Sequence, residues 1–516
     1  MLEYGDGQLL KRVLRSIAAL FAGQSLNTIG NLLLVPLFLS RWPKAEYGEW
    51  LALSAVVACF GVTDLGMNSA AANALTTAYA RRDLTRFRFL QGSAMAFYVG
   101  IALSVSALLG CLIVLFPIPN WIGVRQIPLV TASCAVWVLT ARILWQMPAA
   151  QVSTIYRATG NLAATQWFGN LQALGVIVVT VAVLLFHGGV LQLALWGSAP
   201  LVVVTFGVWR ALRRSHPELL PKLSAARIAG VRELMSPSLM FGLIMISVAV
   251  TTQGPILLVS RALGGGVVAL LVTTRTLGNV IRTLIGTLNV ALWPELTRLD
   301  ATGSAVSLRL NHRLLAFSST ALCASFAGAL WFEGGEVISI WTQGRLTPDI
   351  WLLRLFLLAL VLQAPWLASS VFTAASNRHG KLSCSYAVSA VLTLAATAIL
   401  LRPCGVLAVP LGAILGEALA CYHFVPKDTC AVLDEDYRRF AVQLWIGVAA
   451  MLCAAWGAAW VGHSIAVGPA PVRWLQVGML TTVASFLSGW YTGLRSDDRA
   501  ILVRWGISQW SRPYPE

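Results

Sequence analysis

The chain has 516 residues, of which 57% are hydrophobic and only 11% charged, and its mean hydropathy is +0.74. Soluble globular proteins carry about 25% charged residues, so this composition excludes an ordinary water-soluble fold. The net charge of +16 could suit a nucleic-acid partner, but the basic residues are spread over loops between apolar runs, and no soluble domain gathers them. We therefore predict an all-α polytopic membrane protein that binds no nucleic acid and whose basic loops attract anionic membrane lipids.

Apolar runs long enough to cross about 30 Å of hydrocarbon recur along the whole chain. They predict about fourteen membrane-spanning helices, near residues 16–40, 46–66, 90–116, 127–149, 163–186, 188–208, 237–260, 266–293, 312–332, 351–374, 382–401, 404–425, 440–462 and 474–493. Lys and Arg fall mainly in alternate loops, about 26 against 7 in the loops between them. Because basic loops are retained on the cytoplasmic side, both termini are expected inside the cell.

The longest charged interruption, at residues 210–236, divides the predicted spans into two sets. We expect an N-terminal lobe of six spans at 1–209, a basic cytoplasmic linker at 210–236, a C-terminal lobe of six spans at 237–425, and two further spans with a cytoplasmic tail at 426–516. A proline, a short apolar run and Ser-Arg end both the first span (36–41) and the seventh (255–261). This match favours a parallel duplication, a pattern found in transporters.

Three polar side chains interrupt the eighth predicted span, an apolar run of 28 residues from Gly266 to Trp293; they are Arg275, Asn279 and Arg282. Each guanidinium would cost about 2.5–3.5 kcal/mol in hydrocarbon. Spacings of four and three residues place the three side chains on one helix face, which must therefore face a bundle interior or a water-filled cavity. They could bind an anion there, or pair with buried carboxylates and hold helices together.

The first predicted span carries a stripe of neutral polar residues, Gln24, Asn27, Thr28 and Asn31. Their amide and hydroxyl groups could hydrogen-bond the hydroxyls of a sugar, or they could form a polar seam between two helices. In the fourth span, Arg142 is a further candidate for binding an anionic substrate, because intramembrane charges commonly mark a substrate or ion pathway.

Two intramembrane carboxylates are candidates for coupling transport to an ion gradient: Asp64 near the end of the second span, and Glu417 inside the twelfth. Either could bind H⁺ or Na⁺ in such a role. The alternatives are a structural cap or a gate at Asp64, and pairing with a basic partner at Glu417. The sequence has no metal-ligand spacing, nucleotide-binding loop or catalytic triad, so we expect no enzyme activity and no cofactor beyond a coupling ion.

Short motifs follow one another at set places relative to the predicted spans. They are Gly30-Asn31 before VPLFLSRW, EYGEW at Glu46–Trp50, Asp64-Leu65-Gly66 before a basic segment with Arg81-Arg82-Asp83, TRTLGN at Thr274–Asn279, ALWPE at Ala291–Glu295, and the segment Gly334–Gly344. In this order they resemble polysaccharide (O-antigen) flippases of the multidrug/oligosaccharidyl-lipid/polysaccharide (MOP) exporter superfamily, along roughly residues 10–425.

The resemblance implies a MATE-like fold, with two six-helix lobes forming a V around a central cavity and two appended C-terminal helices. It also implies that the chain moves an undecaprenyl-diphosphate-linked oligosaccharide to the outer leaflet of a bacterial inner membrane by alternating access, beside a polysaccharide polymerase and glycosyltransferases. Arg275 and Arg282 would hold the diphosphate, because guanidinium stays charged and donates in a fork that matches phosphate.

Three other functions stay open at this stage. A flippase for the lipid-linked peptidoglycan precursor, in the same superfamily, would also have about fourteen spans and a cationic cavity. A multidrug antiporter of the superfamily would bind cations and expose acidic residues, whereas this chain offers mostly basic ones. A polytopic polymerase or glycosyltransferase would be an enzyme with a large outer loop, but no predicted outer loop exceeds about 20 residues.

Overall fold

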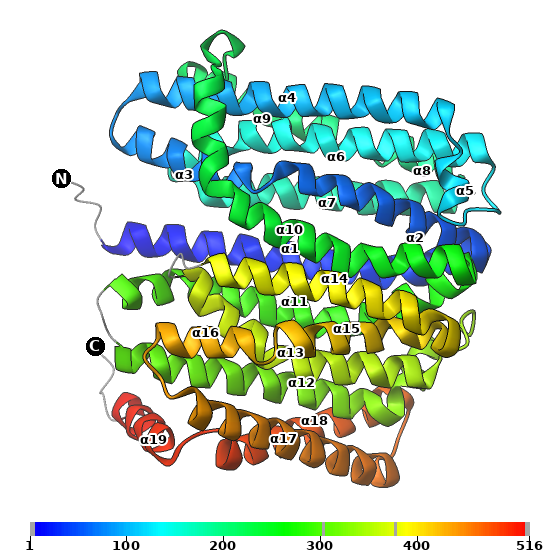
Figure 1. Cartoon of the computed structure of the whole chain (residues 1–516), viewed down its shortest axis with the longest axis vertical. Helices are drawn as coiled ribbons and strands as arrows, with labels where there is room; N and C mark the ends of the chain where they lie inside the picture. Colours follow the sequence, from blue (N-terminus) through cyan, green and yellow to red (C-terminus); the bar gives the residue numbers. More distant parts are fainter. Residues whose placement is uncertain (1–5, 302–304, 376–378, 511–516) are drawn as a thin grey trace. The chain divides into compact units, whose positions relative to one another are not determined.

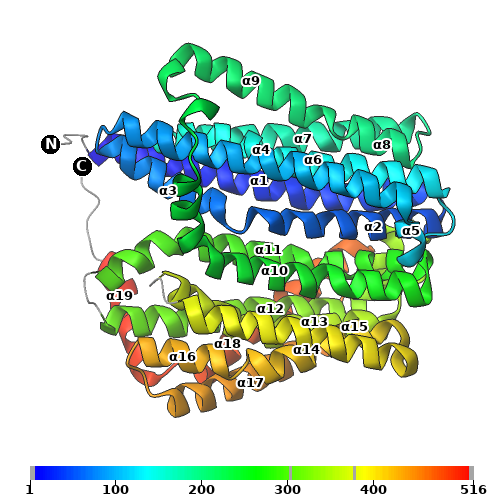
Figure 2. The same ribbon diagram turned by 45° about the horizontal axis from the view of Figure 1, so that its top comes forward.

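The computed structural model describes residues 6–301, 305–375 and 379–510, and every regular element in these ranges is a helix (Figure 1, Figure 2). This confirms the prediction of an all-α protein. The chain divides into two compact units, residues 1–276 with 398–406 and residues 277–397 with 407–516. The lobe boundaries predicted at 209, 237 and 425 stay predictions.

The first unit contains ten α-helices, three short 3₁₀ helices and the start of an eleventh α-helix. The elements are α1 (Asp6–Arg41), α2 (Lys44–Cys59), η1 (Phe60–Asp64), α3 (Met67–Ala80), α4 (Leu84–Leu115), α5 (Ile118–Trp121), α6 (Leu129–Ala158), α7 (Leu162–Leu185), α8 (Val190–Trp196), α9 (Ala199–Ser215), η2 (Pro217–Leu219), η3 (Leu223–Ala225), α10 (Ile228–Leu263) and the first turns of α11 (Gly265–Ala301). Helix α6 lies at its centre, in contact with α2, α3, α4, α7, α8 and α9.

Small residues let two pairs of segments in this unit approach closely. On α1, a Cβ added to Gly30 would lie 2.5 Å from Cδ1 of Ile177 on α7. On α2, a Cβ added to Gly48 would lie 1.6 Å from the carbonyl oxygen of Gly265, at the start of α11. A side chain at either glycine would collide with the neighbouring helix, so these close contacts require glycine. Gly48 belongs to the EYGEW motif, so packing against the α10–α11 turn gives that motif a structural reason.

The second unit is built around α12 (Ala305–Trp341), which packs against three other helices along its length. These are α13 (Ile350–Ala375), α17 (Tyr437–Ile465) and α18 (Ala470–Thr492). The remaining elements are α14 (His379–Cys404), η4 (Gly405–Leu407), α15 (Ala408–Ala420), α16 (Phe424–Val432) and α19 (Ser496–Trp510). The end of α14 and the start of η4, residues 398–406, belong to the first unit. The core of the second unit is apolar and includes Leu357, Val361 and Met451.

Each predicted span coincides with helical chain over most of its length. Twelve described segments are long and apolar enough to cross a membrane: Ala18–Arg41, Lys44–Asp64, Leu84–Leu115, Leu129–Ala158, Leu162–Leu185, Val190–Ser215, Gly242–Leu263, Gly265–Gly286, Ala305–Trp341, Ile350–Ala374, Gly380–Val432 and Tyr437–Ile465. The segment Gly380–Val432 contains both the eleventh and the twelfth predicted spans, and α18 covers the fourteenth. The chain is therefore a multi-pass membrane protein, whereas the count of fourteen spans and their orientation stay predictions.

Candidate functional site

The second span is broken at Asp64, the last residue of η1. Leu65 and Gly66 follow with φ of 49° and 75°, a left-handed turn that is unfavourable for leucine. Oδ1 of Asp64 accepts a hydrogen bond from the hydroxyl of Tyr98 on α4 at 2.5 Å and one from the backbone N–H of Asn68 at 3.3 Å. The carboxylate thus ties the start of α3 to α4. This geometry suits the structural alternative for Asp64, and its role in coupling stays a prediction.

The polar stripe of the first span lies away from the contact between α1 and α7. That contact is built by Gly23 and Gly30 and by Asn170, whose Nδ2 donates to the carbonyl of Ala19 at 2.9 Å. Gln24, Asn27 and Asn31 are exposed and Thr28 is half-buried. None of these four side chains hydrogen-bonds another residue in the described part of the chain, so their donors and acceptors can serve a ligand.

Arg142 lies half-buried on α6, beside the break between α8 and α9. Its Nη1 donates to the carbonyl of Gly197 at 3.4 Å, at the C-terminal end of α8. Its Nε is buried and has no partner among the described residues. A cation at a helix C-terminus is favourable, so this position stabilises the bend between α8 and α9 and leaves one donor unused.

Helix α11 is continuous from Gly265 to Ala301, so Arg275, Asn279 and Arg282 share one helix face as expected. Their surroundings differ. Arg275 lies in the first unit, half-buried, and its Nη1 donates to the carbonyl of Thr252 on α10 at 2.8 Å. Asn279 and Arg282 lie in the second unit and are exposed. The Arg275 contact holds α10 to α11, whereas Arg282 keeps an accessible guanidinium.

Arg282 and Glu417, predicted separately, belong to one polar cluster inside the second unit. The Arg282 guanidinium interacts electrostatically with Glu417 on α15 and with Tyr386 on α14. Glu417 is only 4% exposed and accepts hydrogen bonds from Nε2 of Gln363 at 2.7 Å and from Nε1 of Trp366 at 3.1 Å, both on α13. We call these five residues the Glu417 cluster. A buried carboxylate held by neutral donors near one arginine can take up H⁺ or Na⁺.

Sequence reasoning missed Gln363 and Trp366. The available signal was the glutamine itself, which interrupts the apolar tenth span three residues before Trp366. Spacing of three places both side chains on one face of α13. The sequence does not show which helix packs against this face, because helix pairing is not local in sequence. The carboxylate that binds these two side chains could therefore not be predicted.

A carboxylate that sequence reasoning also missed is Glu49, in the EYGEW motif. Its side chain is buried, and its two oxygens accept hydrogen bonds from the backbone N–H groups of Arg125, Gln126 and Ile127 at 2.7–2.9 Å. Successive backbone N–H groups form a concave anion site of this kind. Glu49 therefore fixes the loop between α5 and α6, which is a structural role within the first unit.

A third group, the Arg313 cluster, joins α12 to α19 and to the loop between α16 and α17. Arg313 donates to Asp498 from Nε and Nη2 at 2.7 and 2.6 Å, and to Glu435 from Nη1 at 2.6 Å. Arg495 and His312 also lie within 3.2 and 3.4 Å of Glu435. Burial opposes ionisation of Glu435, but its hydrogen bonds to His312 and Arg313 outweigh burial and lower its pKa.

Some side chains in and beside the Arg313 cluster are of the kinds that bind metal ions. One atom each of His312, Cys430 and Glu435 lie within 4.8 Å of one another. However, Arg313 and Arg495 both contact Glu435, and two guanidinium groups at the same carboxylate oppose a cation there. The arrangement is that of an ion-pair network.

The helical fold of the chain is that of transporters of the MOP superfamily. A solved structure described as the lipid II flippase MurJ, in an inward closed conformation, is 13% identical, has a TM-score of 0.67, and matches 96% of this chain and 100% of that one. An inward-facing multidrug resistance MATE transporter is 14% identical, has a TM-score of 0.66, and matches 80% of this chain and 95% of that one.

A third neighbour is a MOP superfamily transporter from Pyrococcus furiosus, described as having a binding pocket of reversed polarity. It is 14% identical, has a TM-score of 0.57, and matches 83% of this chain and 97% of that one. No family model matches the sequence, and no curated protein matches it. Identities this low show the fold alone, and the neighbours that share it are transporters.

Proposed function

We propose that this chain is a flippase that moves an undecaprenyl-diphosphate-linked oligosaccharide from the inner to the outer leaflet of the bacterial inner membrane by alternating access. The observation that carries the proposal is the extent of the structural likeness. The lipid II flippase matches 96% of the chain and the multidrug transporter 80%. A match over nearly the whole chain reaches α17 and α18, which follow the expected twelve-span core.

Arginine chemistry supports a diphosphate cargo. Such a substrate carries two negative charges, and guanidinium matches phosphate because it stays charged and donates two parallel hydrogen bonds. In the proposal Arg282 and Arg275 hold the diphosphate, with Asn279 on the same helix face. Arg142 is a further anion contact. These basic residues do not suit a cation-transporting antiporter, because they repel a cationic substrate.

The sugar is assigned to the first span. Gln24, Asn27, Thr28 and Asn31 offer donors and acceptors with no partner in the described chain. Amide and hydroxyl groups of this kind suit sugar hydroxyls. The protein would act beside glycosyltransferases that build the cargo and a polymerase that consumes it in surface polysaccharide synthesis.

Coupling to an ion gradient is assigned to the Glu417 cluster. The Arg282 guanidinium attracts Glu417 and repels a cation from it. A diphosphate bound to Arg282 would neutralise that charge, so substrate binding would favour uptake of H⁺ or Na⁺ at Glu417. By linkage, ion binding would strengthen substrate binding equally. Asp64 is the second candidate, behind Glu417, because its carboxylate is already bonded to Tyr98 and to the backbone of Asn68.

The substrate site is tested by surface polysaccharide in a strain that lacks its own flippase, with membrane abundance measured in parallel. The parent chain should restore polysaccharide, Arg282→Ala should abolish it at normal abundance, and Arg282→Lys should retain part of it, because lysine keeps the charge without the fork. The matched control is Arg402→Ala, an exposed arginine near the end of α14. Full export by an abundant Arg275→Ala, Arg282→Ala double variant would remove the diphosphate site from α11.

Coupling is tested in proteoliposomes with imposed pH or sodium gradients. Glu417→Gln keeps the acceptor oxygen for Gln363 or Trp366 but cannot ionise, so a gradient should no longer accelerate transport. Asp64→Asn is measured beside it. A gradient effect that survives in Glu417→Gln and disappears in Asp64→Asn would move the ion site to Asp64.

The second candidate function is a flippase for the lipid-linked peptidoglycan precursor, favoured by the same 96% match to the lipid II flippase. Both cargoes carry a lipid diphosphate, so the arginine variants do not separate them. A complementation experiment separates the two cargoes. If the chain restores growth of cells depleted of their lipid II flippase, its cargo is the peptidoglycan precursor. If it restores surface polysaccharide but not growth, its cargo is the oligosaccharide.

A further inference from the structure

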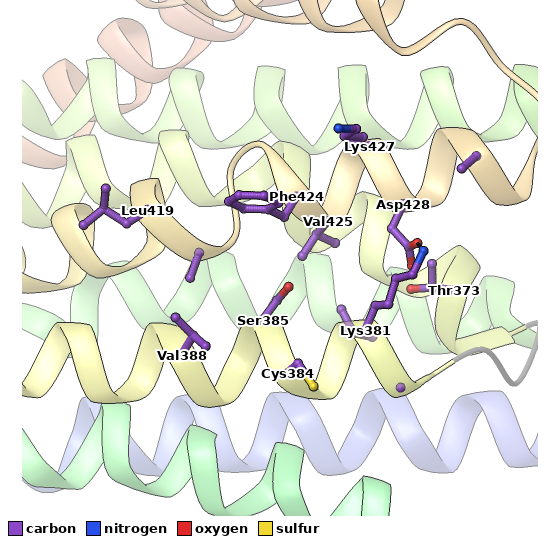
Figure 3. Close-up of a pocket in the computed structure, with 14 residues that line it drawn as sticks. Thr373, Lys381, Cys384, Ser385, Val388, Leu419, Phe424, Val425, Lys427 and Asp428 are labelled. Carbon is purple, nitrogen blue, oxygen red and sulfur yellow. Dashed lines mark hydrogen bonds and ion pairs between the residues drawn. The ribbon is translucent and has the colours of Figure 1, made fainter.

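A groove of about 850 Å³ lies in the second unit, between α14 and the bent pair α15 and α16 (Figure 3). It is distinct from the Glu417 cluster, since neither Glu417 nor Tyr386 lines it. Its volume falls in the range of about 300–1,000 Å³ that is usual for sites of small ligands. In Figure 3, Val388 and Cys384 on α14 lie on one side, and Leu419 and Phe424 lie on the other.

Close packing of α14 against α15 bounds the groove at one end. A Cβ added to Gly412 or Gly416 on α15 would lie 2.3 Å from the hydroxyl oxygen of Thr397 or Thr393 on α14. Beyond this contact α15 ends at Ala420, and the chain turns before α16 begins at Phe424. At the other end, Nζ of Lys381 reaches across to Oδ1 of Asp428 at 2.8 Å. The groove is thus bounded by a glycine contact and by an ion pair.

The middle of the groove and its end near α16 differ in chemistry. The middle is apolar, and the large side chains there are strongly exposed: Leu419 is 64%, Phe424 54% and Val388 51% accessible. The end near α16 holds two ammonium groups, Lys381 and Lys427, against the single carboxylate of Asp428. Within the described chain Lys427 has no carboxylate partner. An occupant must therefore be apolar along most of its length and negative at one end.

We propose that this groove binds one anionic phospholipid, with its phosphate at Lys427 and Lys381 and an acyl chain along Val388, Leu419 and Phe424. The predicted topology places the loops near Lys381 and Lys427 on the cytoplasmic side, where the leaflet surface is negative and basic pockets between helices hold anionic headgroups. The inference goes beyond the proposed transport function and does not depend on it.

The test uses the purified full-length protein and lipids of defined headgroup. Native mass spectrometry should retain one phosphatidylglycerol, with phosphatidylcholine bound at least tenfold more weakly, and phosphatidylglycerol should raise the melting temperature. Lys381→Glu with Lys427→Glu should remove the headgroup preference. Val388→Trp, which fills the apolar middle from an exposed position, should reduce retention of either lipid at least tenfold. The matched control is Arg438→Glu, an exposed cation on α17 outside the groove.

Three outcomes overturn the proposal. Unchanged phosphatidylglycerol retention in both groove variants would place the lipid elsewhere. An equal loss of phosphatidylglycerol retention in the Arg438→Glu control would show that the effect comes from surface charge in general. Displacement of the lipid by a polyprenyl phosphate at equal concentration would assign the groove to the tail of a transported lipid instead. The melting temperature of each variant without added lipid shows that it is folded.

Discussion

Replacing Arg313 with alanine should destabilise the second unit by about 3–5 kcal/mol, the usual effect of breaking a buried ion pair from one side. The side chains of Glu435 and Asp498 are each only 2% exposed. After the change, Glu435 still contacts Arg495 at 3.2 Å and His312 at 3.4 Å. Asp498 loses both of its bonds to Arg313, so most of the effect comes from a buried carboxylate left without a cation.

The matched control is Glu233→Ala, which breaks the pair between Arg86 and Glu233 in the first unit. Those side chains are 53% and 42% exposed, and an exposed pair contributes about 0–1 kcal/mol. Both variants are compared with the parent by thermal unfolding in the same detergent, and the folded fraction is followed by size-exclusion chromatography. Arg313→Ala should melt several degrees below the control.

A further variant tests the assigned cause. Removing Asp498 together with Arg313 leaves no unpaired carboxylate at that position, so the Arg313→Ala, Asp498→Ala double variant should recover part of the loss. Equal melting temperatures for Arg313→Ala and Glu233→Ala would refute the reasoning, because the buried network would then contribute no more than a surface pair.

The remaining predictions concern single groups. Because the folded pKa of Glu435 is lowered from its ordinary value of 4.5, its stabilising effect is present above the ordinary pKa and is lost as pH falls through the folded value. The melting temperature of the parent should therefore drop more steeply than that of Glu435→Gln as the pH falls below about 4.5. Gly48→Ala should lower the unfolding free energy by about 1–3 kcal/mol, since its Cβ would meet the Gly265 backbone, and Gly100→Ala, where space is open, is the control. Tyr98→Phe should lower it by about 1.5–3 kcal/mol through the lost bond to Asp64; an unchanged denaturation midpoint would show that water replaces the hydroxyl.

The positions of the helices could be predicted from the sequence because hydrophobicity is local. The apolar run at 90–116 lies in α4, which begins at Leu84 because the side chain of Asp83 accepts a hydrogen bond from the backbone N–H of Arg86 at 2.8 Å. The cap extends the helix beyond its apolar part. The run at 312–332 likewise lies within the longer α12.

The composition of the sites could be predicted only in part. Arg282 and Glu417 were both singled out as charges that are costly in hydrocarbon, and the structure brings them into one cluster. The partners Gln363 and Trp366 lie 54 and 51 residues from Glu417 along the chain. Arg313 lies at the start of the ninth predicted span, and its partners follow 122 and 185 residues later along the chain. The sequence identifies charged side chains in apolar segments, but their partners are known only from the tertiary packing.

The long separation within the Arg313 cluster has a consequence for biosynthesis. Arg313 leaves the ribosome 185 residues before Asp498, which corresponds to roughly 10–40 s at about 5–20 residues per second. During that interval α12 can be inserted and packed on α13, but its guanidinium lacks the carboxylate that will hold it. Glu435 follows Arg313 by 122 residues and Asp498 by 185, so the Arg313 cluster can be completed only after α19 has been synthesised.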